Sequence, residues 1–407
     1  MGLIVQKYGG TSVADMARIR KVAERVAGAR REGHEVVAVI SAMAGTTDQL
    51  LAWAQALAPD PDLREVDMLL SSGERVTSAL VAIALRGAGV AAHSLSGEQV
   101  GIRTDEAHTR ARVRSISAER LREALAAGEV PVVAGFQGVN ERQEVTTLGR
   151  GGSDLSAIAL AAALGAERCQ IYTDVGGVYT ADPALVPGAR RLERISYDEM
   201  MELATLGARV LQSRAVELAK KFSVPIQVLS SFEEGGGTLV TAEEPGMEEA
   251  VVSAVSCDRD IGKVTILGVP DRPGIAARLF GLLGEAGIVV DLIVQNVSER
   301  GLTDISFTVP RADLARAEAL AREAHADVGA QGVTSQADVA KVSIVGVGMK
   351  SQSGVAARMF GALAGEGINI MMITTSDISV SCVIEAQHTG HAVRAIHDAF
   401  GLAGGSG

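Results

Sequence analysis

One lysine and one arginine, each beside glycines, are the residues of this sequence best suited to hold an anion. Lys7 follows an apolar run and precedes the glycine pair at 9–10, and Arg150 stands inside the glycine loop at 149–152. Glycine lets backbone N–H groups approach a ligand closely, and a guanidinium can grip a carboxylate or phosphate with two hydrogen bonds. Within residues 3–18 alone, an ordinary strand, turn and helix with a surface lysine explains the pattern equally well.

Carboxylates and hydroxyls accompany these two cations, and each also has a simpler structural explanation. Asp154 opens a helical stretch, where a carboxylate stabilises the positive end of a helix. Glu74 lies between a glycine and an apolar helix, which predicts a solvated helix end. Ser41 and Thr47 flank a flexible turn, where helix capping accounts for both. The stretch YTDVGGVYTADP at 172–183 either frames a nucleotide or forms a hairpin around its glycines.

Several other reaction classes are disfavoured. The chain has no Walker A pattern. The histidines His34, His93 and His108 show neither metal-ligand spacing nor a nearby nucleophile, so we interpret them as structural or surface groups. What remains is phosphate-binding loops, two cations and a few carboxylates. This set suits phosphoryl transfer, because that reaction depends mainly on positioning and charge neutralisation.

The composition is typical of a globular protein that handles small molecules. The 407 residues allow two or three domains, and 47% of them are hydrophobic while 21% are charged. We expect no membrane span, since no apolar run approaches the roughly 18 residues needed, and no signal peptide. The net charge of −11, without basic blocks rich in aromatics, disfavours nucleic-acid binding. Three widely spaced cysteines favour buried thiols and a cytoplasmic location.

Strands and helices alternate along the first half of the chain, and their ends would position the chemical groups. We expect strands at 35–41, 130–136, 168–174 and 224–230, with helical patterns between them. This alternation predicts an α/β sandwich with a mostly parallel sheet. Ligands in such sheets gather at the carboxyl ends of the strands, which is where the glycine loops and hydroxyls stand.

Two helix starts are also predicted. A helix should begin near Thr46, and another should follow the first glycine pair with Thr11 or Ser12 as its cap. The apolar face of that helix would consist of Met16, Ile19, Val22, Ala23 and Val26.

An internal repeat follows a Gly- and Glu-rich stretch at 233–249, which we expect to be a linker. The segments that start at Lys263 and at Lys341 run in register after a two-residue insertion. Each has a strand, a glycine-bearing loop, an amphipathic helix, a Gly-Ile turn and a second strand, which predicts two βαββαβ domains. The predicted domains are therefore residues 1–232, 250–335 and 336–407.

Seven motifs occur in order along the chain: KYGGTS (7–12), SAM (41–43), SSGER (71–75), GFQGVN (135–140), TTLGRGGSD (146–154), YTDVGGVYTADP (172–183) and GARVLQSRAVELA (207–219). Together they resemble the aspartate kinases of the amino acid kinase superfamily, and the C-terminal repeat resembles their paired ACT regulatory domains. The resemblance covers nearly the whole chain. It implies a three-layer αβα sandwich with a mainly parallel sheet, followed by two ferredoxin-like ACT domains.

The resemblance implies transfer of the ATP γ-phosphoryl group to the β-carboxylate of L-aspartate. The product would be 4-phospho-L-aspartate, on the route to lysine, threonine and methionine. The implied cofactor is ATP with Mg²⁺, the metal being held mainly by the phosphates and not by a site on the protein. The nucleophile is a carboxylate with a pKa of about 4, so it is already ionised at neutral pH and no general base is needed.

The resemblance also implies roles for individual residues. Lys7 would hold the phosphates, Asp154 would orient Lys7, and Arg150 would clamp the α-carboxylate, which makes these three the implied catalytic residues. Glu74 would face the α-ammonium group. The implied nucleotide-binding residues are Lys7, Tyr8, Gly9, Gly10, Ser41, Thr173, Asp174, Tyr179, Thr180, Asp182 and Arg209. The implied substrate-binding residues are Ser41, Thr47, Glu74, Arg150, Gly151, Gly152 and Ser153.

Two positions depart from the family pattern at the nucleotide site. Ala184 stands where arginine is usual after TADP, and Arg209 stands where lysine is usual in the GARVL stretch. Arg209 keeps the positive charge in a different shape, whereas Ala184 lacks a cation on the phosphate side. The sequence therefore predicts the type of reaction more firmly than it predicts the affinity for ATP.

The ACT resemblance implies feedback by an end-product amino acid, with threonine as the expected effector and lysine as a second candidate. Effectors in the family bind between ACT domains of two chains, which implies a homo-oligomer. The two repeats are not equivalent, since Val289 stands where the second has Asn369, and Met349 and Lys350 replace an Asp-Arg pair. The implied effector-binding residues are Asp271, Arg272, Pro273, Gly274, Ile275, Ala276, Val290, Asp291, Gln295, Asn296, Asn369 and Ile370.

Other interpretations remain open. A non-catalytic amino-acid sensor would keep the ACT domains beside an inactive kinase domain, and Ala184 leaves room for it. Another amino acid kinase would act on a different acid, although Glu74 and Arg150 favour a free α-amino acid over an N-acylated one. Some relatives also make the regulatory region as a separate subunit from an internal start. Met247 lies at that boundary, where a linker methionine can equally be incidental.

Overall fold

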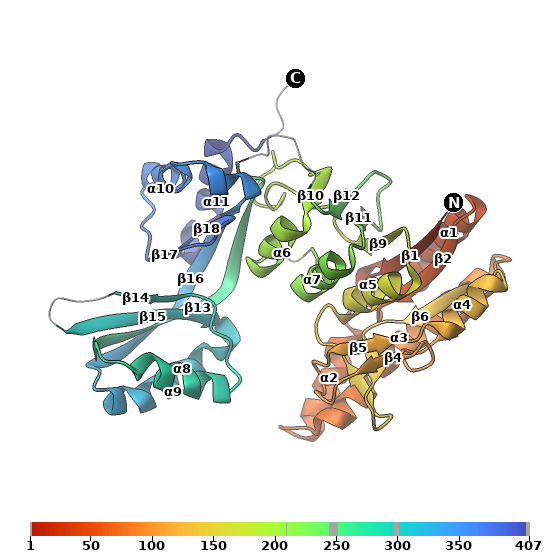
Figure 1. Ribbon diagram of the computed structural model, residues 1–407, viewed down its shortest axis with the longest axis horizontal. Helices are drawn as coiled ribbons and strands as arrows, with labels where there is room; N and C mark the ends of the chain where they lie inside the picture. Colours follow the sequence, from red (N-terminus) through yellow and green to blue (C-terminus); the bar gives the residue numbers. More distant parts are fainter. Residues whose placement is uncertain (1, 209, 244–250, 297–300, 404–407) are drawn as a thin grey trace. The chain divides into compact units, whose positions relative to one another are not determined.

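The chain divides into two compact units in the structure, a computed structural model that describes residues 2–208, 210–243, 251–296 and 301–403 (Figure 1). The first unit consists of Met1–Val178, Arg191–Thr205 and Arg209–Met247. The second unit consists of Tyr179–Arg190, Leu206–Ala208 and Glu248–Gly407. Residues 179–190, which fall inside the first domain predicted from the sequence, thus pack with the second unit.

An eight-stranded sheet forms the middle layer of the first unit. Its strands lie in the order β10-β12-β11-β9-β1-β2-β6-β3, and every neighbouring pair is parallel except β11 with β12. The predicted α/β sandwich with a mainly parallel sheet is confirmed. The strands are β1 (Leu3–Tyr8), β2 (Glu35–Ile40), β3 (Ala92–Leu95), β6 (Val130–Ala134), β9 (Arg168–Thr173), β10 (Arg194–Ser196), β11 (Ile226–Ser230) and β12 (Thr238–Thr241).

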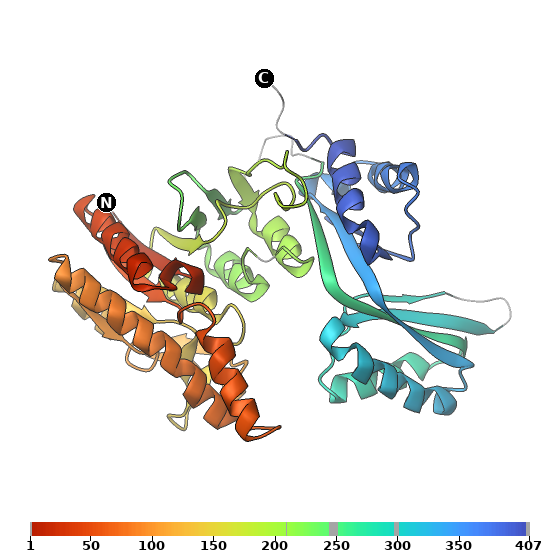
Figure 2. The ribbon, with the colours of Figure 1, turned by 180° about the vertical axis from the view of Figure 1, so that it is seen from behind.

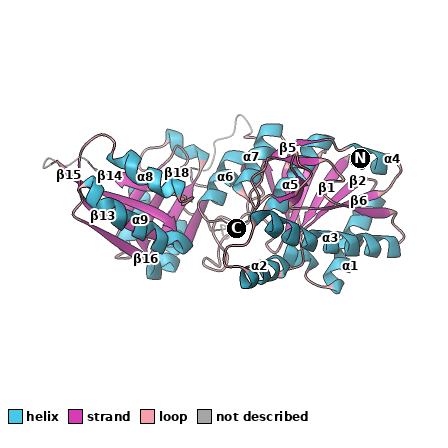
Figure 3. Ribbon diagram, turned by 90° about the horizontal axis from the view of Figure 1, so that it is seen from below, coloured by secondary structure: helices cyan, strands magenta, loops and turns pink. Residues whose placement is uncertain are grey.

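Helices cover both faces of this sheet, as the cyan ribbons on either side of the magenta strands show in Figure 3. Helices α1 (Met16–Arg31) and α3 (Leu63–Gly87) contact each other on one face, where they pack against Ile4 and Tyr8 of β1 (Figure 2). Helix α5 (Gly152–Leu164) contacts β1 and β9 from the other face. The other described α-helices of the unit are α2 (Thr46–Leu57), α4 (Glu119–Ala126), α6 (Tyr197–Thr205) and α7 (Ser213–Phe222).

A second, four-stranded sheet lies beside α3. Its order is β5-β4-β7-β8, and β8 contacts α3. Strand β8 ends three residues before Arg150, so this small sheet sets where the glycine loop begins. The strands are β4 (Ile102–Thr104), β5 (Val113–Ile116), β7 (Gln137–Val139) and β8 (Val145–Thr147).

Helix α3 is the one helix in the described part of the chain that is long and apolar enough to cross a membrane. Its mean hydropathy over an 18-residue window is 1.3, but half of that window is buried inside the protein. A core helix passes the same test of length and composition. We expected no apolar stretch long enough to span a membrane, and α3 is the exception to that expectation among the described residues.

Helix α1 begins later than the sequence predicted. Residues Gly10–Val13 form a short 3₁₀ turn, and α1 starts at Met16 with Asp15 as its cap. The predicted cap, Thr11 or Ser12, is wrong, because both lie in that preceding turn and the Asp15 carboxylate accepts a backbone N–H of the first helical turn. Met16 is exposed, and the buried face consists of the other four predicted residues, Ile19, Val22, Ala23 and Val26, together with Ala27.

A six-stranded antiparallel sheet runs through the second unit, in the order β14-β15-β13-β16-β18-β17. Two helices accompany each half of the sheet, as the sequence repeat predicted. The strands are β13 (Ala254–Pro270), β14 (Ile293–Gln295), β15 (Leu302–Pro310), β16 (Gly332–Val345), β17 (Met372–Thr375) and β18 (Ser379–Glu385). The helices are α8 (Ile275–Glu285), α9 (Leu314–Val328), α10 (Val355–Gly365) and α11 (Thr389–Ala399).

The two repeats share their long strands β13 and β16. Residues 254–258 of β13 pair with 341–345 of β16, whereas residues 261–267 pair with the first half of β16 and with β15. Val255 accordingly packs in the core of the second repeat, and Val264 packs in the core of the first. The structure thus differs from a linear division at residue 335, because the second repeat takes a strand from residues that precede the first.

Candidate active site

Lys7 and Asp154 form a short, largely buried ion pair at the carboxyl end of β1. Lys7 Nζ lies 2.6 Å from Asp154 Oδ1, and the two side chains are 12% and 9% exposed. Lys7 points toward α5 because Tyr8, its neighbour in the strand, points into the core on the opposite face. Asp154 lies in the first turn of α5, where the helix dipole favours a carboxylate. The structure therefore joins two of the three predicted catalytic groups.

Glycines allow three backbone segments to meet beside this pair. The Gly9 N–H donates to the Tyr172 carbonyl at 3.2 Å, and the Gly10 carbonyl accepts the Ala44 N–H at 3.2 Å. A Cβ on Gly10 would lie 2.9 Å from the Ala42 carbonyl oxygen. A side chain at position 10 would therefore push the loops after β1 and β2 apart.

Tyr8 and the hydroxyl residues near it differ in what they offer a ligand. The Tyr8 carbonyl accepts the Ser41 N–H at 3.1 Å. The Tyr8 ring is fully buried and stacks 4.7 Å from that of Tyr172, and burial raises the pKa of the Tyr8 hydroxyl. Ser41 and Thr47 are half-buried, at the end of β2 and in the first turn of α2. The side chain of Tyr8 is thus committed to the core and only its backbone is available beside the loops, while the side chains of Ser41 and Thr47 remain partly exposed.

The glycine loop before α5 approaches its neighbours closely. Gly151 has a φ of +72°, a conformation that favours glycine. A Cβ on Gly152 would lie 2.8 Å from the nearest side-chain atom, and one on Gly135 would lie 2.9 Å from Ser153 Oγ. Arg150 is exposed. The loop therefore holds its backbone tightly while the guanidinium remains open to a ligand.

Glu74 lies in the middle of α3 and is 3% exposed, so the predicted solvated helix end is wrong. Its Oε1 accepts the Ala42 N–H at 3.1 Å, and its Oε2 is buried with no hydrogen-bond partner among the described residues. Burial raises the pKa of Glu74 to about 7, and the hydrogen bond from Ala42 offsets part of that rise. Because an unpartnered buried carboxylate oxygen is costly, this atom is suited to accept a cationic ligand.

Gly73 explains how α3 comes so near the loop after β2. A Cβ on Gly73 would lie 2.9 Å from Ala42 Cβ and 3.3 Å from Thr46 Cγ2. Glycine weakens a helix interior, but here it removes a clash. The close approach places the Glu74 carboxylate against Ala42 and beside the start of α2.

The predicted nucleotide residues fall in both units. Thr173 ends β9, and its hydroxyl donates to Asp174 Oδ1 at 3.1 Å in the first unit. Tyr179 and Asp182 belong to the second unit, where Asp182 is exposed and accepts the Ala184 N–H at 2.9 Å. Arg209 lies outside the described residues. The structure thus places Asp174 and Asp182 at accessible positions and leaves the contribution of Arg209 untested.

Thr180 is fully buried inside the second unit. Its Oγ1 lies 2.9 Å from His397 Nε2, and it also accepts the Arg190 N–H at 3.1 Å. Burial lowers the pKa of His397, which favours the neutral ring. The side chain of Thr180 is therefore committed to internal contacts, and only its backbone could face a nucleotide.

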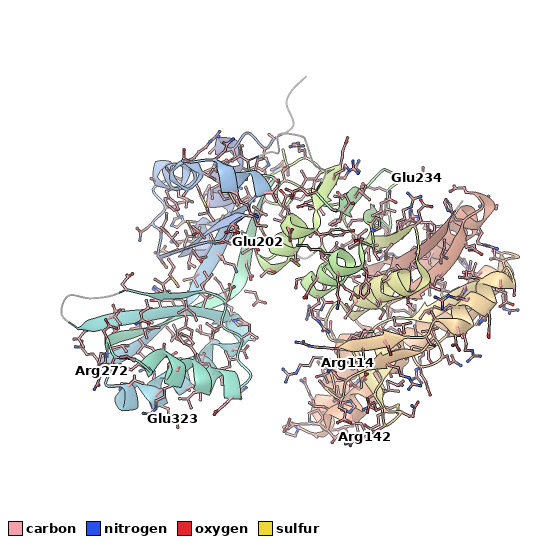
Figure 4. The ribbon with its side chains drawn as sticks, in the orientation of Figure 1. Arg114, Arg142, Glu202, Glu234, Arg272 and Glu323 are labelled. Carbon is pink, nitrogen blue, oxygen red and sulfur yellow. The ribbon has the colours of Figure 1, made fainter. Side chains whose placement is uncertain are left out.

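The predicted effector loop lies before α8 in the first repeat. Asp271, Arg272, Pro273 and Gly274 are all exposed, and Figure 4 shows Arg272 on the outside of the repeat. Gly274 has a φ of +95° and precedes α8, which starts with Ile275 and Ala276; Gly354 has a φ of +87° at the same place before α10. The two loops are thus alike in backbone although their side chains differ.

The other predicted effector residues follow the helices α8 and α10. Asp291 forms an ion pair with Lys341, whose side chain is only 1% exposed. Asp291, although predicted to bind an effector, thus already has an ionic partner in the second repeat. The exposed positions are Gln295, Asn296 and Asn369, and the half-buried ones are Val290 and Ile370.

Two polar groups that the sequence did not single out lie next to the Arg150 loop. Gln212 fills the space beside Gly151, and its Oε1 is buried with no hydrogen-bond partner in the described part of the chain. Asp67 of α3 is fully buried and accepts the Thr109 N–H at 3.0 Å. The sequence did carry one indication that Asp67 belongs near the site: it lies seven residues before Glu74 and therefore on the same face of the helix.

The donor set for a metal ion can be tested on the described residues. They contain no group of three or more His, Cys, Asp or Glu side chains placed to hold one. The carboxylate nearest the glycine loops, Asp154, is neutralised by Lys7. These groups fit a divalent ion that arrives already bound to phosphate oxygens.

Family models match almost the whole length of the chain. The amino acid kinase family matches residues 2–230, and the ACT domain matches residues 263–329 and again 342–400. An aspartate kinase from Stutzerimonas stutzeri is 53% identical over 403 residues, which cover 99% of this chain and 98% of that protein.

Solved structures agree with the sequence comparisons. E. coli aspartokinase III in complex with aspartate and ADP superposes with a TM-score of 0.80 at 27% identity, covering 98% of this chain and 99% of that one. The same enzyme in complex with lysine and aspartate gives a TM-score of 0.78 at 27% identity, covering 97% and 99%.

Proposed function

The chain belongs to the aspartate kinases of the amino acid kinase family, and on that premise we propose how its own residues perform the reaction. The enzyme phosphorylates aspartate with ATP and carries ACT domains for feedback regulation. An oxygen of the substrate β-carboxylate attacks the γ-phosphorus. The bond from that phosphorus to the β–γ bridging oxygen breaks, and ADP leaves with the electron pair.

The Lys7–Asp154 pair is the observation that carries the proposed chemistry. It lies where the loops after β1 and β2 meet α5, and phosphates favour a helix N-terminus. Lys7 offsets the negative charge that gathers on the transferred group, and Asp154 fixes the position of Lys7. The ionised β-carboxylate needs no general base, so repulsion between two anions is the main barrier that these groups lower.

Glu74 and Arg150 hold the two ends of the amino acid. The unpartnered Oε2 of Glu74 accepts the α-ammonium group, and this cation restores the charged form of a carboxylate whose pKa burial has raised. The exposed Arg150 guanidinium binds the α-carboxylate with two hydrogen bonds. Ser41, Thr47 and the backbone of residues 151–153 complete the substrate site.

The nucleotide is held by backbone and by a few side chains. Gly9 and Gly10 admit the phosphates, and Thr173 and Asp174 contact the rest of the nucleotide, together with the backbone of Tyr8. The family resemblance assigns further nucleotide contacts to Tyr179, Thr180, Asp182 and Arg209. Magnesium would be held mainly by the ATP phosphates, since its preferred ligands are oxygens, and it would supply neutralisation of phosphate charge beside Lys7.

Threonine is the expected effector of the ACT domains, with lysine as a second. The enzyme works as a homo-oligomer through these domains, and Met247, which lies outside the described residues, is a candidate start for a separate regulatory subunit. The cytoplasm is its expected location. The three cysteines are free, and Cys169 and Cys382 are buried.

The test is magnesium-dependent ATP consumption with L-aspartate, in which hydroxylamine traps the acyl phosphate. We expect hydroxamate that depends on aspartate and falls when threonine is added. The absence of any product, together with threonine binding in calorimetry, would instead indicate an amino-acid sensor.

A further inference from the structure

We propose that Asp67 is a positioning residue for aspartate binding, because it anchors the loop that carries Arg150 to helix α3. The inference rests on the proposed function, since it concerns the same substrate site. Asp67 has no exposed surface, so its carboxylate acts through its neighbours and not by touching the substrate.

Asp67 is surrounded by hydrogen-bond donors. His108 Nδ1 lies 2.8 Å from its Oδ2, and the Thr109 N–H lies 3.0 Å from each of its two oxygens. The Thr147 hydroxyl donates to Oδ1. A buried carboxylate held by several donors loses little from leaving water and fixes the groups that donate to it. Glu74, on the same helix, keeps one oxygen unpartnered and so remains able to bind a ligand.

These donors belong to the segments that form the base of the Arg150 loop. Thr147 is the last residue of β8, three positions before Arg150, and its carbonyl accepts the Ala111 N–H at 2.9 Å. Thr109 has a φ of +65°, a strained conformation for a β-branched residue. A Cβ on Gly149 would lie 3.2 Å from the Thr109 carbonyl oxygen. Asp67 therefore holds in place the backbone against which Gly149 rests.

Arg214 of α7 holds the same loop from another side. One of its Nη atoms donates to the Leu148 carbonyl at 3.0 Å, and the other donates to the Ala111 carbonyl at 3.0 Å. Asp67 and Arg214 together fix the two residues before Gly149 and the segment 108–111 that lies beside it. Of these two contacts, the one through Asp67 is the link to α3.

Helix α3 consequently carries both ends of the substrate site. Asp67 and Glu74 are two helical turns apart, about 10 Å along the axis, and both are buried on the inner side of the helix. One rigid helix thus sets the separation between the carboxylate for the α-ammonium group and the loop for the α-carboxylate. Loosening the Asp67 anchor should weaken aspartate binding and leave ATP binding almost unchanged, because Lys7 and Thr173 stand on other strands.

The experiment measures the KM for aspartate and for MgATP with the hydroxamate assay in the wild-type chain and three variants. Asp67→Asn keeps the shape of the side chain, but its amide NH₂ group faces hydrogen-bond donors and cannot accept from them. Thr147→Val and His108→Ala each remove one donor and leave the carboxylate in place. We expect the KM for aspartate to rise roughly tenfold or more in Asp67→Asn and several-fold in the other two, with the KM for MgATP within about twofold of wild type.

Two further variants separate positioning from general damage. His108→Asn offers an amide N–H near the place of Nδ1 and should recover at least half of the affinity that His108→Ala loses. Glu106→Gln removes an exposed ion pair with Arg142 in the same segment and should change neither KM. If Asp67→Asn fails to fold, the KM values for aspartate in Thr147→Val and His108→Ala test the positioning role of Asp67.

The outcomes distinguish this inference from the function on which it rests. A wild-type chain that forms no hydroxamate overturns the proposed function and this inference with it. An active wild type whose folded variants keep the normal KM for aspartate, or raise both KM values equally, overturns only the positioning role of Asp67.

Discussion

Two of the lysine–aspartate pairs, one taken from each unit, show how the same two side chains can have different roles. Lys7 and Asp154 lie where strand β1 ends and helix α5 begins, and glycine loops surround them. Lys341 lies within strand β16 with 1% exposure, and it pairs with Asp291 of the preceding repeat. The first pair lies at the glycine loops where we propose that the substrates bind, whereas the second joins the segment before β14 to strand β16.

The two pairs differ in role because of the groups around them, and not because of the paired residues themselves. The first unit also leaves the Oε2 of Glu74 and the guanidinium of Arg150 open. In the second unit, Lys341 pairs with Asp291, which lies in the segment just before β14, and the Thr180 hydroxyl bonds to His397. In the first unit, the open carboxylate of Glu74 and the open guanidinium of Arg150 thus accompany the Lys7–Asp154 pair, whereas Lys341 is satisfied within its own unit.

The largest expected effect is that of Lys7→Ala. It should lower kcat about a hundredfold or more, because one preorganised cation next to the transferred phosphoryl group is lost. Lys21→Ala, on the exposed side of α1, is the matched control and should keep normal activity. The hydroxamate assay measures both, with circular dichroism as the check on folding. Near-normal turnover in Lys7→Ala would remove the distinction between the two pairs.

Asp154→Asn should lower kcat by roughly tenfold or more, because the amide no longer holds Lys7 by charge. If the two residues act as a unit, the double variant with Lys7→Ala should be about as slow as Lys7→Ala alone, since effects within a unit are not additive. A double-mutant cycle on kcat measures this coupling. Simple additivity would mean that Asp154 has a separate role.

The pH dependence of aspartate binding should follow Glu74. Burial raises its pKa to about 7, and only the ionised carboxylate binds the ammonium group. The KM for aspartate should therefore rise roughly tenfold as the pH falls from 8 to 6. Glu74→Gln should raise the KM at pH 8 and remove this dependence. Initial rates across the pH range give the answer, and a flat profile for the wild type would contradict this role.

Glu74→Gln should also change stability in the opposite direction to activity. Because the pKa of the folded state is raised above the unfolded value, the unionised form is favoured in the folded protein, and stability is lost as the pH rises through about 7. The variant should thus gain up to about 3 kcal/mol in unfolding free energy at pH 8 and nothing at pH 4. Denaturant unfolding at both pH values tests this sign.

The smallest effect on turnover is expected for Lys341→Met. It should leave kcat within about twofold, because the Met side chain fills the same buried space and the Asp291 carboxylate, which is 33% exposed, can be solvated by water once its partner is gone. Without Lys341, Asp291 is free to rearrange, so the threonine concentration that gives half inhibition should shift. Lys263→Met, at the equivalent place in the first repeat, is the control and should leave that concentration unchanged. A tenfold loss of kcat would show that this pair is not merely structural.

Much of the fold could be predicted from periodicity. The alternation of strands and helices, the repeat that starts at Lys263 and Lys341, and the glycine loops beside Lys7 and Arg150 all depend on short-range patterns that the chain carries locally. The predictions that failed share one cause, which is contact between segments that are distant in the sequence. The burial of Glu74 depends on Gly73 meeting Ala42, and the packing of residues 179–190 depends on Thr180 meeting His397.

The sequence by itself determined the types of chemical groups and the elements that carry them, because helix and strand periods, capping residues and glycines act over a few positions. The tertiary structure alone decided which charges remain open. Asp67 and Glu74 are carboxylates on one face of one helix, yet one is enclosed by donors and the other keeps a free oxygen. That difference arises from segments distant in the sequence, and desolvation and hydrogen bonding give it its chemical consequence.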